Sequence, residues 1–283
     1  MDHPPGILVF PAESVPRGAV LVLSGSSGRV ESQRARLLAR HGVAAMSCRW
    51  FGAAGQPPGI CEVALESFAP ALNRLAQISQ NLIVVGTSKG AEAALLLASR
   101  DARISGVVGF SPTSVVWANV GPGRDGRTRP CRSSWTAGGT PLPYVPYDDR
   151  WQPVVVNGAP AFRTMYEQSL GTFADHIGEA EIAVERIAGR VVVTAGGDDQ
   201  VWPADRFARR IAQRRADHGL ATTVLIDRRA GHRVLLPGET SNAASGMTMA
   251  RGGSPEADAA FGHRIWQALV DALSLYPKTP PQA

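Results

Sequence analysis

The sequence has little of what would mark a secreted, metal-binding or membrane-spanning protein. Its 283 residues include only three cysteines, Cys48, Cys61 and Cys131, at unrelated spacings and without a Cys-x-x-Cys pair. This argues against a disulfide framework or a zinc site. We expect neither a metal nor a cofactor. No apolar run approaches the roughly 18 residues that span a bilayer, and no signal-peptide pattern opens the chain. We therefore expect a cytoplasmic protein without a membrane partner.

Positive charge is in slight excess and is not concentrated in any one segment of the chain. Lysine and arginine number 29 against 24 aspartate and glutamate residues, a formal net charge of +5. The basic residues are scattered and are not interleaved with aromatic residues, so the pattern gives no support to nucleic-acid binding. With 44% hydrophobic residues, the chain can bury a substantial core. One large α/β domain over residues 1–283 is the expectation.

Short apolar runs alternate with helical patterns along most of the chain. Strands are expected at residues 19–23, 42–47, 82–85, 104–110, 190–194 and 222–226, and helices at 31–40, 63–77, directly after 88, at 181–187, 204–218 and 255–273. Repeated β-α-β order predicts a mostly parallel sheet with helices on both faces.

Two segments depart from this alternation. Residues 117–176 are rich in glycine, proline and arginine, and a stretch of this length predicts a loop-rich insertion or lid that lies over the site. The tail, residues 276–283, is expected to be disordered.

The most informative motif is Gly-x-Ser-x-Gly at residues 86–90, between an apolar run and a helical stretch. This order predicts a sharp strand-to-helix turn that exposes a serine hydroxyl. A side chain at position 86 or 90 would strike the neighbouring strand or helix, so both glycines fit the turn. Ser88 is therefore the candidate nucleophile. The alternative is a turn in which the serine only caps the helix.

A serine hydroxyl needs a base that takes its proton and an acid that orients the base. Hydrolases with the serine on such a strand-to-helix turn carry the three residues in the order Ser, Asp, His along the chain. We assign the acid to Asp199, after the strand at 190–194, and keep Asp198 as the alternative. His232 follows the last strand in a small-residue turn and is the candidate base. The expected oxyanion donors are the backbone N–H groups of Lys89 and Ser26.

Other charged residues near these motifs have plainer interpretations. Lys89 stands three positions before Glu92, so its side chain is expected to form a surface ion pair. The insertion contains basic residues that either meet the phosphates of an acyl carrier or are solvated: Arg124, Arg127, Arg129 and Arg132.

With these motifs in place, the chain resembles the catalytic C-terminal domain shared by acyl-CoA thioesterases and bile-acid-CoA:amino-acid N-acyltransferases. The likeness covers about residues 18–275 and includes Ser-Lys-Gly-Ala-Glu at 88–92, Asp-Asp-Gln-Val-Trp-Pro at 198–203 and Ala-Gly-His at 230–232. Segments 139–143 and 181–187 also contribute. This family is a branch of the α/β-hydrolase superfamily near the dienelactone hydrolases.

The resemblance implies an α/β-hydrolase fold and carries the nucleophile onto Ser88, the acid onto Asp199 and the base onto His232. The family's amino-acid acyltransferases use cysteine at the elbow, so serine favours hydrolysis. Two departures are expected: the chain lacks room for the amino-terminal β-sandwich domain of the animal enzymes, and the oxyanion loop reads Ser-Gly-Ser-Ser-Gly at 24–28.

We therefore expect a serine acyl hydrolase that acts on a small-molecule acyl thioester or ester, with acyl-CoA as the leading substrate. Three alternatives stay open. The first is an acyltransferase that moves the acyl group to an amine or alcohol. The second is a carboxylester or dienelactone-type hydrolase. The third is a hydrolase-fold binding protein without turnover.

Overall fold

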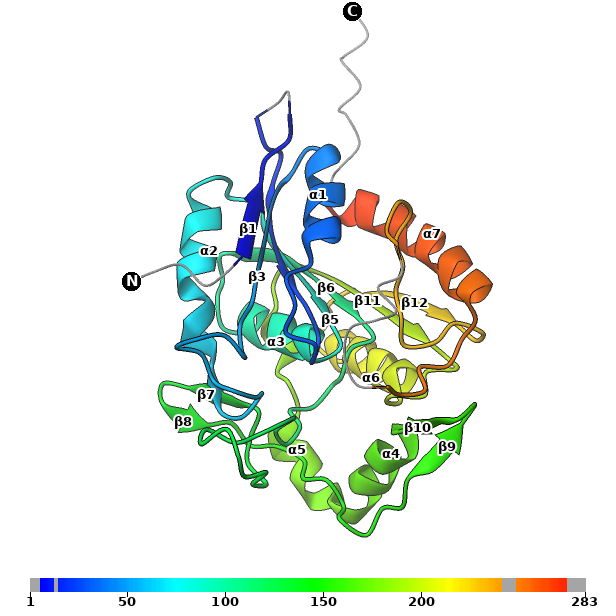
Figure 1. The fold of residues 1–283 in the computed structure, drawn as a ribbon. Coiled ribbons are helices and arrows are strands. Elements are labelled where there is room, and N and C mark those ends of the chain that lie inside the picture. Colours follow the sequence, from blue (N-terminus) through cyan, green and yellow to red (C-terminus); the bar gives the residue numbers. More distant parts are fainter. Residues whose placement is uncertain (1–5, 13–14, 241–247, 274–283) are drawn as a thin grey trace, which may run out of the picture.

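A seven-stranded sheet runs through the centre of the structure, a computed structural model that describes residues 6–12, 15–240 and 248–273 (Figure 1). The spatial order is β1-β3-β2-β5-β6-β11-β12. Neighbouring strands are parallel except β1, which pairs antiparallel with β3. The strands are β1 Gly6–Val9, β2 Ala19–Leu23, β3 Ala44–Cys48, β5 Leu82–Thr87, β6 Ile104–Phe110, β11 Arg190–Gly196 and β12 Thr223–Asp227. The predicted α/β-hydrolase sheet is confirmed, while the tail at 276–283 lies outside the described residues.

Helices cover both faces of this sheet. On β2, Val20 and Val22 belong to one apolar cluster while Leu21 and Leu23 belong to another, as the two-residue period of a strand dictates. The first cluster is completed by α1 Ser32–Arg40 and α7 Pro255–Ala272, the second by α2 Ala69–Ala76, α3 Lys89–Ala98 and α6 Ala204–Ala216. Burial from both sides explains why the inner strands are continuous apolar runs.

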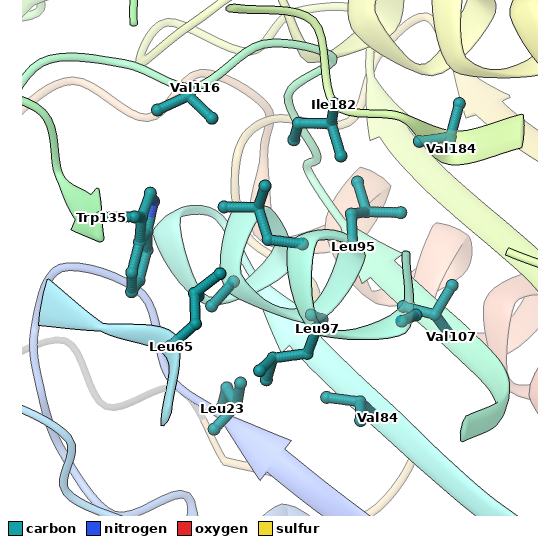
Figure 2. Close-up of a cluster of buried hydrophobic side chains, with 14 of the residues drawn as sticks. Leu23, Leu65, Val84, Leu95, Leu97, Val107, Val116, Trp135, Ile182 and Val184 are labelled. Atoms are coloured by element: carbon teal, nitrogen blue, oxygen red, sulfur yellow. The ribbon is translucent and has the colours of Figure 1, made fainter. Parts of the chain in front are cut away.

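Helix α3 lies between the sheet and a second layer of chain. All ten of its residues, Lys-Gly-Ala-Glu-Ala-Ala-Leu-Leu-Leu-Ala, are buried. Figure 2 shows Leu97 on the side of Leu23 and Val84, and Leu95 on the side of Ile182. Because α3 has no solvent-exposed face, close packing fixes the position of the helix that begins after the turn at residue 88.

The insertion at residues 117–176 contains short elements that its composition did not suggest. They are β7 Trp135–Ala137, β8 Thr140–Pro141, β9 Val154–Val156, β10 Ala159–Ala161, α4 Arg163–Thr172 and the 3₁₀ turn Ala174–His176. Strand β7 pairs with β8 and with β4 Val63–Ala64, which precedes α2. In Figure 1 this green segment lies along one end of the body, below α3 and α6.

Two expected helices differ from the structure. Residues 63–77 form β4, the 3₁₀ turn Leu65–Phe68 and α2 rather than one helix. The helix expected at 181–187 is wrong: α5 Ile177–Ala180 ends before it, and only the 3₁₀ turn Val184–Arg186 follows. The reason is pairing with another segment, since Ile182 N–H donates to Ser114 C=O and Val116 N–H donates to Ala180 C=O.

Among the described helices, none has the length and the apolar character that crossing a bilayer would require.

Candidate active site

The Gly-x-Ser-x-Gly motif forms a tight turn between β5 and α3. Ser88 has φ 56° and ψ −121°, a conformation that L-residues rarely adopt. Its N–H donates to Phe110 C=O on the neighbouring strand β6 (2.9 Å). Ser88 stands at the N-cap of α3, but its side chain makes no capping hydrogen bond. The capping alternative therefore fails, and the strained backbone is the kind found at functional sites.

Both glycines of the motif are required by close backbone contacts. A Cβ atom at Gly86 would lie 2.0 Å from Gly90 C=O oxygen, and one at Gly90 would lie 2.3 Å from Ser24 C=O oxygen. Neither contact can be relieved by a side-chain rotation, because both partners are backbone atoms. The strand, the turn and the helix can approach this closely only with glycine at both positions.

Asp199 and His232 meet at the carboxyl edge of the sheet. His232 Nδ1 lies 2.7 Å from Asp199 Oδ2, and the Asp199 side chain is fully buried. The other carboxylate oxygen accepts the N–H groups of Val201 (2.8 Å) and Trp202 (3.1 Å), which fixes its orientation. Asp198 is exposed and its carboxylate instead accepts the N–H of Gly253 (2.8 Å). Of the two candidate acids, only Asp199 contacts the histidine.

The loop that carries His232 is held by hydrogen bonds from three other segments. His232 N–H donates to Arg251 C=O (2.8 Å), and Ser111 Oγ donates to His232 C=O (3.0 Å). Asp258, in the first turn of α7, accepts the N–H of Gly231 (2.8 Å), and burial raises the pKa of Asp258 above its ordinary value. The imidazole is therefore positioned through its backbone as well as through Asp199.

Ser88 and His232 line one cavity of about 860 Å³. Part of its wall is aromatic and comes from the insertion and the turn after β11: Tyr147, Phe162, Tyr166 and Trp202. Within the described residues, no group of three or more histidine, cysteine, aspartate or glutamate side chains gathers in a way that could hold a metal ion. The arrangement suits acid–base and nucleophilic chemistry on a ligand with an apolar part.

The expected oxyanion donors come from the start of α3 and from the loop after β2. Lys89 is the first residue of α3, so its N–H is one of those that have no partner within the helix. The loop after β2 approaches Ser88 closely: a Cβ atom at Gly25 would lie 3.1 Å from Ser88 Cβ. Ser26 follows on the same loop and lines the cavity. Backbone N–H groups at these two places could bind the negatively charged oxygen that forms when Ser88 attacks a carbonyl group.

The expected surface ion pair of Lys89 is wrong, because the pair is buried. Lys89 Nζ lies 2.7 Å from Glu92 Oε2, with side chains 2% and 0% exposed. Burial lowers the pKa of Lys89, while Glu92 acts in the opposite direction. The spacing of three residues was correctly recognised, but spacing alone cannot show that a helix is covered on all faces.

Arg34 of α1 connects the two loops that carry Ser88 and His232. Its guanidinium donates to both carboxylate oxygens of Glu239 (2.8 Å each), to Thr87 Oγ1 (3.1 Å) and to Val234 C=O (3.1 Å). The Phe110 ring lies 4.8 Å from the guanidinium carbon. Sequence reasoning missed Arg34, since its partners lie 53 to 205 positions away and no local pattern links them.

The arginines of the insertion have different surroundings. Arg124 and Arg132 form ion pairs with the buried carboxylate of Glu62 (3.1 and 2.7 Å). Arg129 lines the cavity. Arg127 is exposed, and its N–H donates to Asp125 Oδ1 (3.0 Å).

With this geometry established, comparison with known proteins identifies the family. Residues 63–275 match the family described as "BAAT / Acyl-CoA thioester hydrolase C terminal". The chain belongs to this family. Among its relatives, the Acyl-coenzyme A amino acid N-acyltransferase 1 of Mus musculus is 28% identical over 276 residues, which is 93% of this chain and 61% of that protein. The Acyl-coenzyme A thioesterase 6 of Mus musculus is 26% identical over 96% of this chain and also 61% of its own length.

This member of the BAAT / acyl-CoA thioester hydrolase family thus spans less than two thirds of these relatives. A solved structure, the thermophilic esterase Est2 from Thermogutta terrifontis, matches it with a TM-score of 0.53 at 14% identity, over 96% of this chain and 88% of that one. At such identity the likeness concerns the fold, and it agrees with the α/β-hydrolase architecture described above.

Proposed function

We propose that this chain is a serine acyl hydrolase that cleaves acyl thioesters, with acyl-CoA as the substrate. One observation carries the proposal: the buried Asp199 carboxylate lies 2.7 Å from His232 Nδ1, and His232 lines the same cavity as Ser88. An imidazole held in this way has its other nitrogen available as a general base for a serine hydroxyl. The cytoplasmic location expected from the sequence stays a prediction.

In the first half-reaction, Ser88 Oγ attacks the acyl carbonyl carbon and its proton passes to His232 Nε2. The negative charge on the carbonyl oxygen is stabilised by the N–H groups of Lys89 and Ser26. Collapse of the tetrahedral intermediate breaks the C–S bond, and the leaving thiolate takes the proton from His232. The acyl group is then an ester of Ser88.

In the second half-reaction, a water molecule attacks this ester while His232 accepts its proton. Collapse releases the carboxylic acid and returns the proton to Ser88. Asp199 stays ionised and stabilises the imidazolium in both halves. The N–H groups of Val201 and Trp202 support this role, because they bind the Asp199 oxygen that faces away from His232.

A second candidate is acyl transfer from Ser88 to an amine or an alcohol. The similarity to the mouse Acyl-coenzyme A amino acid N-acyltransferase 1 favours it, as does a cavity wall built partly from the insertion, which can restrict water. A serine rather than a cysteine at position 88 favours hydrolysis. Incubation with an acyl-CoA and candidate amines, followed by mass spectrometry of amide and free acid, separates the two: free acid alone with every acceptor excludes transfer.

The test of the leading proposal uses Ser88→Ala and an organophosphonate label. We expect Ser88→Ala to lower kcat for acyl-thioester hydrolysis by roughly 10⁴-fold and to abolish labelling. Ser105→Ala, at the exposed start of β6, is the control and should retain both. Retention of most turnover by Ser88→Ala, or labelling at another residue, would reject the proposal. If the purified native protein is neither labelled nor active, it is a hydrolase-fold binding protein without turnover.

A further inference from the structure

The cavity that contains Ser88 and His232 has a cationic side that the proposed reaction does not use. Arg29, from the loop before α1, lines it together with Arg233 and Arg251, from the segments around His232 and before α7. Three arginines from three separate segments thus line one cavity. The catalytic steps above require none of these charges.

Arg251 is the best placed of the three. Its C=O accepts the N–H of His232 (2.8 Å), so its backbone is fixed beside the candidate base. The side chain is half-buried, and no ion pair joins it to a carboxylate of residues 6–12, 15–240 or 248–273. By contrast Arg34, which lines the same cavity, is neutralised by two hydrogen bonds to Glu239.

The charges of the neighbouring arginines act on Arg251. Burial lowers the pKa of Arg251, and the charges of Arg233 and Arg29 lower it further. Of the carboxylates that line the cavity, Glu31 pairs with Arg29 (2.8 Å) and Glu239 with Arg34 (2.8 Å). Asp258 accepts a backbone N–H, and the charge of Arg233 acts to lower the pKa of Asp258. A bound anion would offset the burial of Arg251 and the repulsion that Arg233 and Arg29 exert on it.

We propose that Arg251, with Arg29 and Arg233 beside it, forms a subsite for an anionic group of the substrate, a phosphate or a carboxylate. Guanidinium groups suit both anions because their planar N–H groups can donate two parallel hydrogen bonds. The inference deepens the proposed function, on which it rests for the position of the acyl carbonyl at Ser88. It selects anionic acyl thioesters over neutral ones.

The two anion sources can be told apart by calorimetric binding to the Ser88→Ala protein, which does not consume the ligands. The ligands are free CoA, which carries phosphates, adipoyl-pantetheine, which carries a carboxylate, and neutral pantetheine. We expect at least one anionic ligand to bind about tenfold or more tightly than pantetheine. Which one does so identifies the anion.

The variants then assign the effect to the arginine. Adding Arg251→Gln should weaken binding of that anionic ligand by about 10- to 100-fold, which is the size of one charge-assisted interaction. Arg251→Lys should fall between, and Arg233→Gln should act in the same direction. Arg209→Gln is the matched control, because Arg209 is exposed on α6 and does not line the cavity. Its affinity should stay within about twofold.

The outcomes separate this inference from the proposed function. If neither anionic ligand binds better than pantetheine, or if Arg251→Gln and Arg233→Gln both bind as tightly as their parent, the subsite is overturned, even when Ser88 turns over a thioester. If binding depends on Arg251 while the native protein hydrolyses no thioester, the subsite stands and the hydrolase proposal fails. Circular-dichroism melting verifies that each variant is folded.

Discussion

The buried carboxylate of Glu92 accepts a hydrogen bond from the indole N–H of Trp135, 43 positions further along the chain (Nε1–Oε1 2.8 Å). The same oxygen accepts the backbone N–H of Trp117 (3.1 Å), and the other oxygen pairs with Lys89 Nζ. One side chain of α3 therefore connects the residue after the candidate nucleophile to the start of the insertion. Such a network stabilises only when all its members are present.

Removal of the cation from this network should be strongly destabilising. Lys89→Met leaves the Glu92 carboxylate buried without its counter-ion, and we expect a loss of about 3–5 kcal/mol in the free energy of unfolding. The double variant Lys89→Met/Glu92→Gln should recover part of this loss, because a neutral amide keeps an acceptor for the two tryptophan donors. Urea unfolding measures the free energy of unfolding of the double variant and of the two single variants, Lys89→Met and Glu92→Gln. If the loss in the double variant equals the sum of the two single losses, Lys89 and Glu92 do not act as a pair.

The sequence was sufficient to predict the sheet because its inner strands are continuous apolar runs between helical patterns. Strand β1 was missed because it has only four residues, Gly6–Val9, and pairs antiparallel at the sheet edge. The error at residues 181–187 also comes from pairing between distant segments. Residues 180–182 pair with residues 114–116, a contact that no local pattern can reveal.

The candidate site was predictable as far as its residues carry a local motif. Gly-x-Ser-x-Gly, the Asp-Asp turn and Ala-Gly-His each mark the end of a strand, and parallel strands end at the same edge. Ser111 and Arg34 carry no such mark: Ser111 is a buried residue with φ 45° whose side chain supports His232 C=O, and Arg34 comes from a helix. Their roles follow only from contacts between distant segments.

The two neighbouring aspartates give a matched pair of variants. Asp199→Asn keeps the size of the side chain but removes the charge that orients His232, so we expect kcat for thioester hydrolysis to fall roughly 10⁴-fold. Asp198→Asn changes an exposed carboxylate that binds Gly253 N–H and Gln200, and kcat should stay within about threefold. Steady-state kinetics at neutral pH measures both, and equal losses would remove Asp199 from its assigned role.

Asp148 predicts a pH dependence of stability within the insertion. Its carboxylate accepts hydrogen bonds from Arg150, from Gln168 (3.0 Å) and from Thr172 (2.6 Å), and these hold its pKa well below the ordinary value. An acid with a lowered pKa in the folded state stabilises that state above its unfolded pKa, near 3.9 for aspartate, and the contribution is lost as the pH falls below that value.

The variant Asp148→Asn isolates this contribution. Wild type should be more stable than Asp148→Asn at about pH 6, and the difference should shrink as the pH is lowered through about 4 toward 3. Urea unfolding at each pH measures it, and amide exchange of α4, which carries Gln168 and Thr172, locates it. A difference that stays constant over this range would show that the carboxylate does not contribute through its charge.

Arg34 should position the site as well as stabilise the fold. Arg34→Lys keeps the charge near Glu239, but an ammonium cannot reproduce the contacts to Thr87 and Val234 together, so the loops of Ser88 and His232 lose a common anchor. For a loss of one to two such hydrogen bonds we expect kcat for a neutral ester to fall roughly tenfold or more, with a smaller change in KM. Arg190→Lys, at the exposed start of β11, is the control and should keep kcat. If Arg34→Lys lowered the melting temperature while kcat stayed at the wild-type value below it, Arg34 would support the fold without positioning the reacting groups.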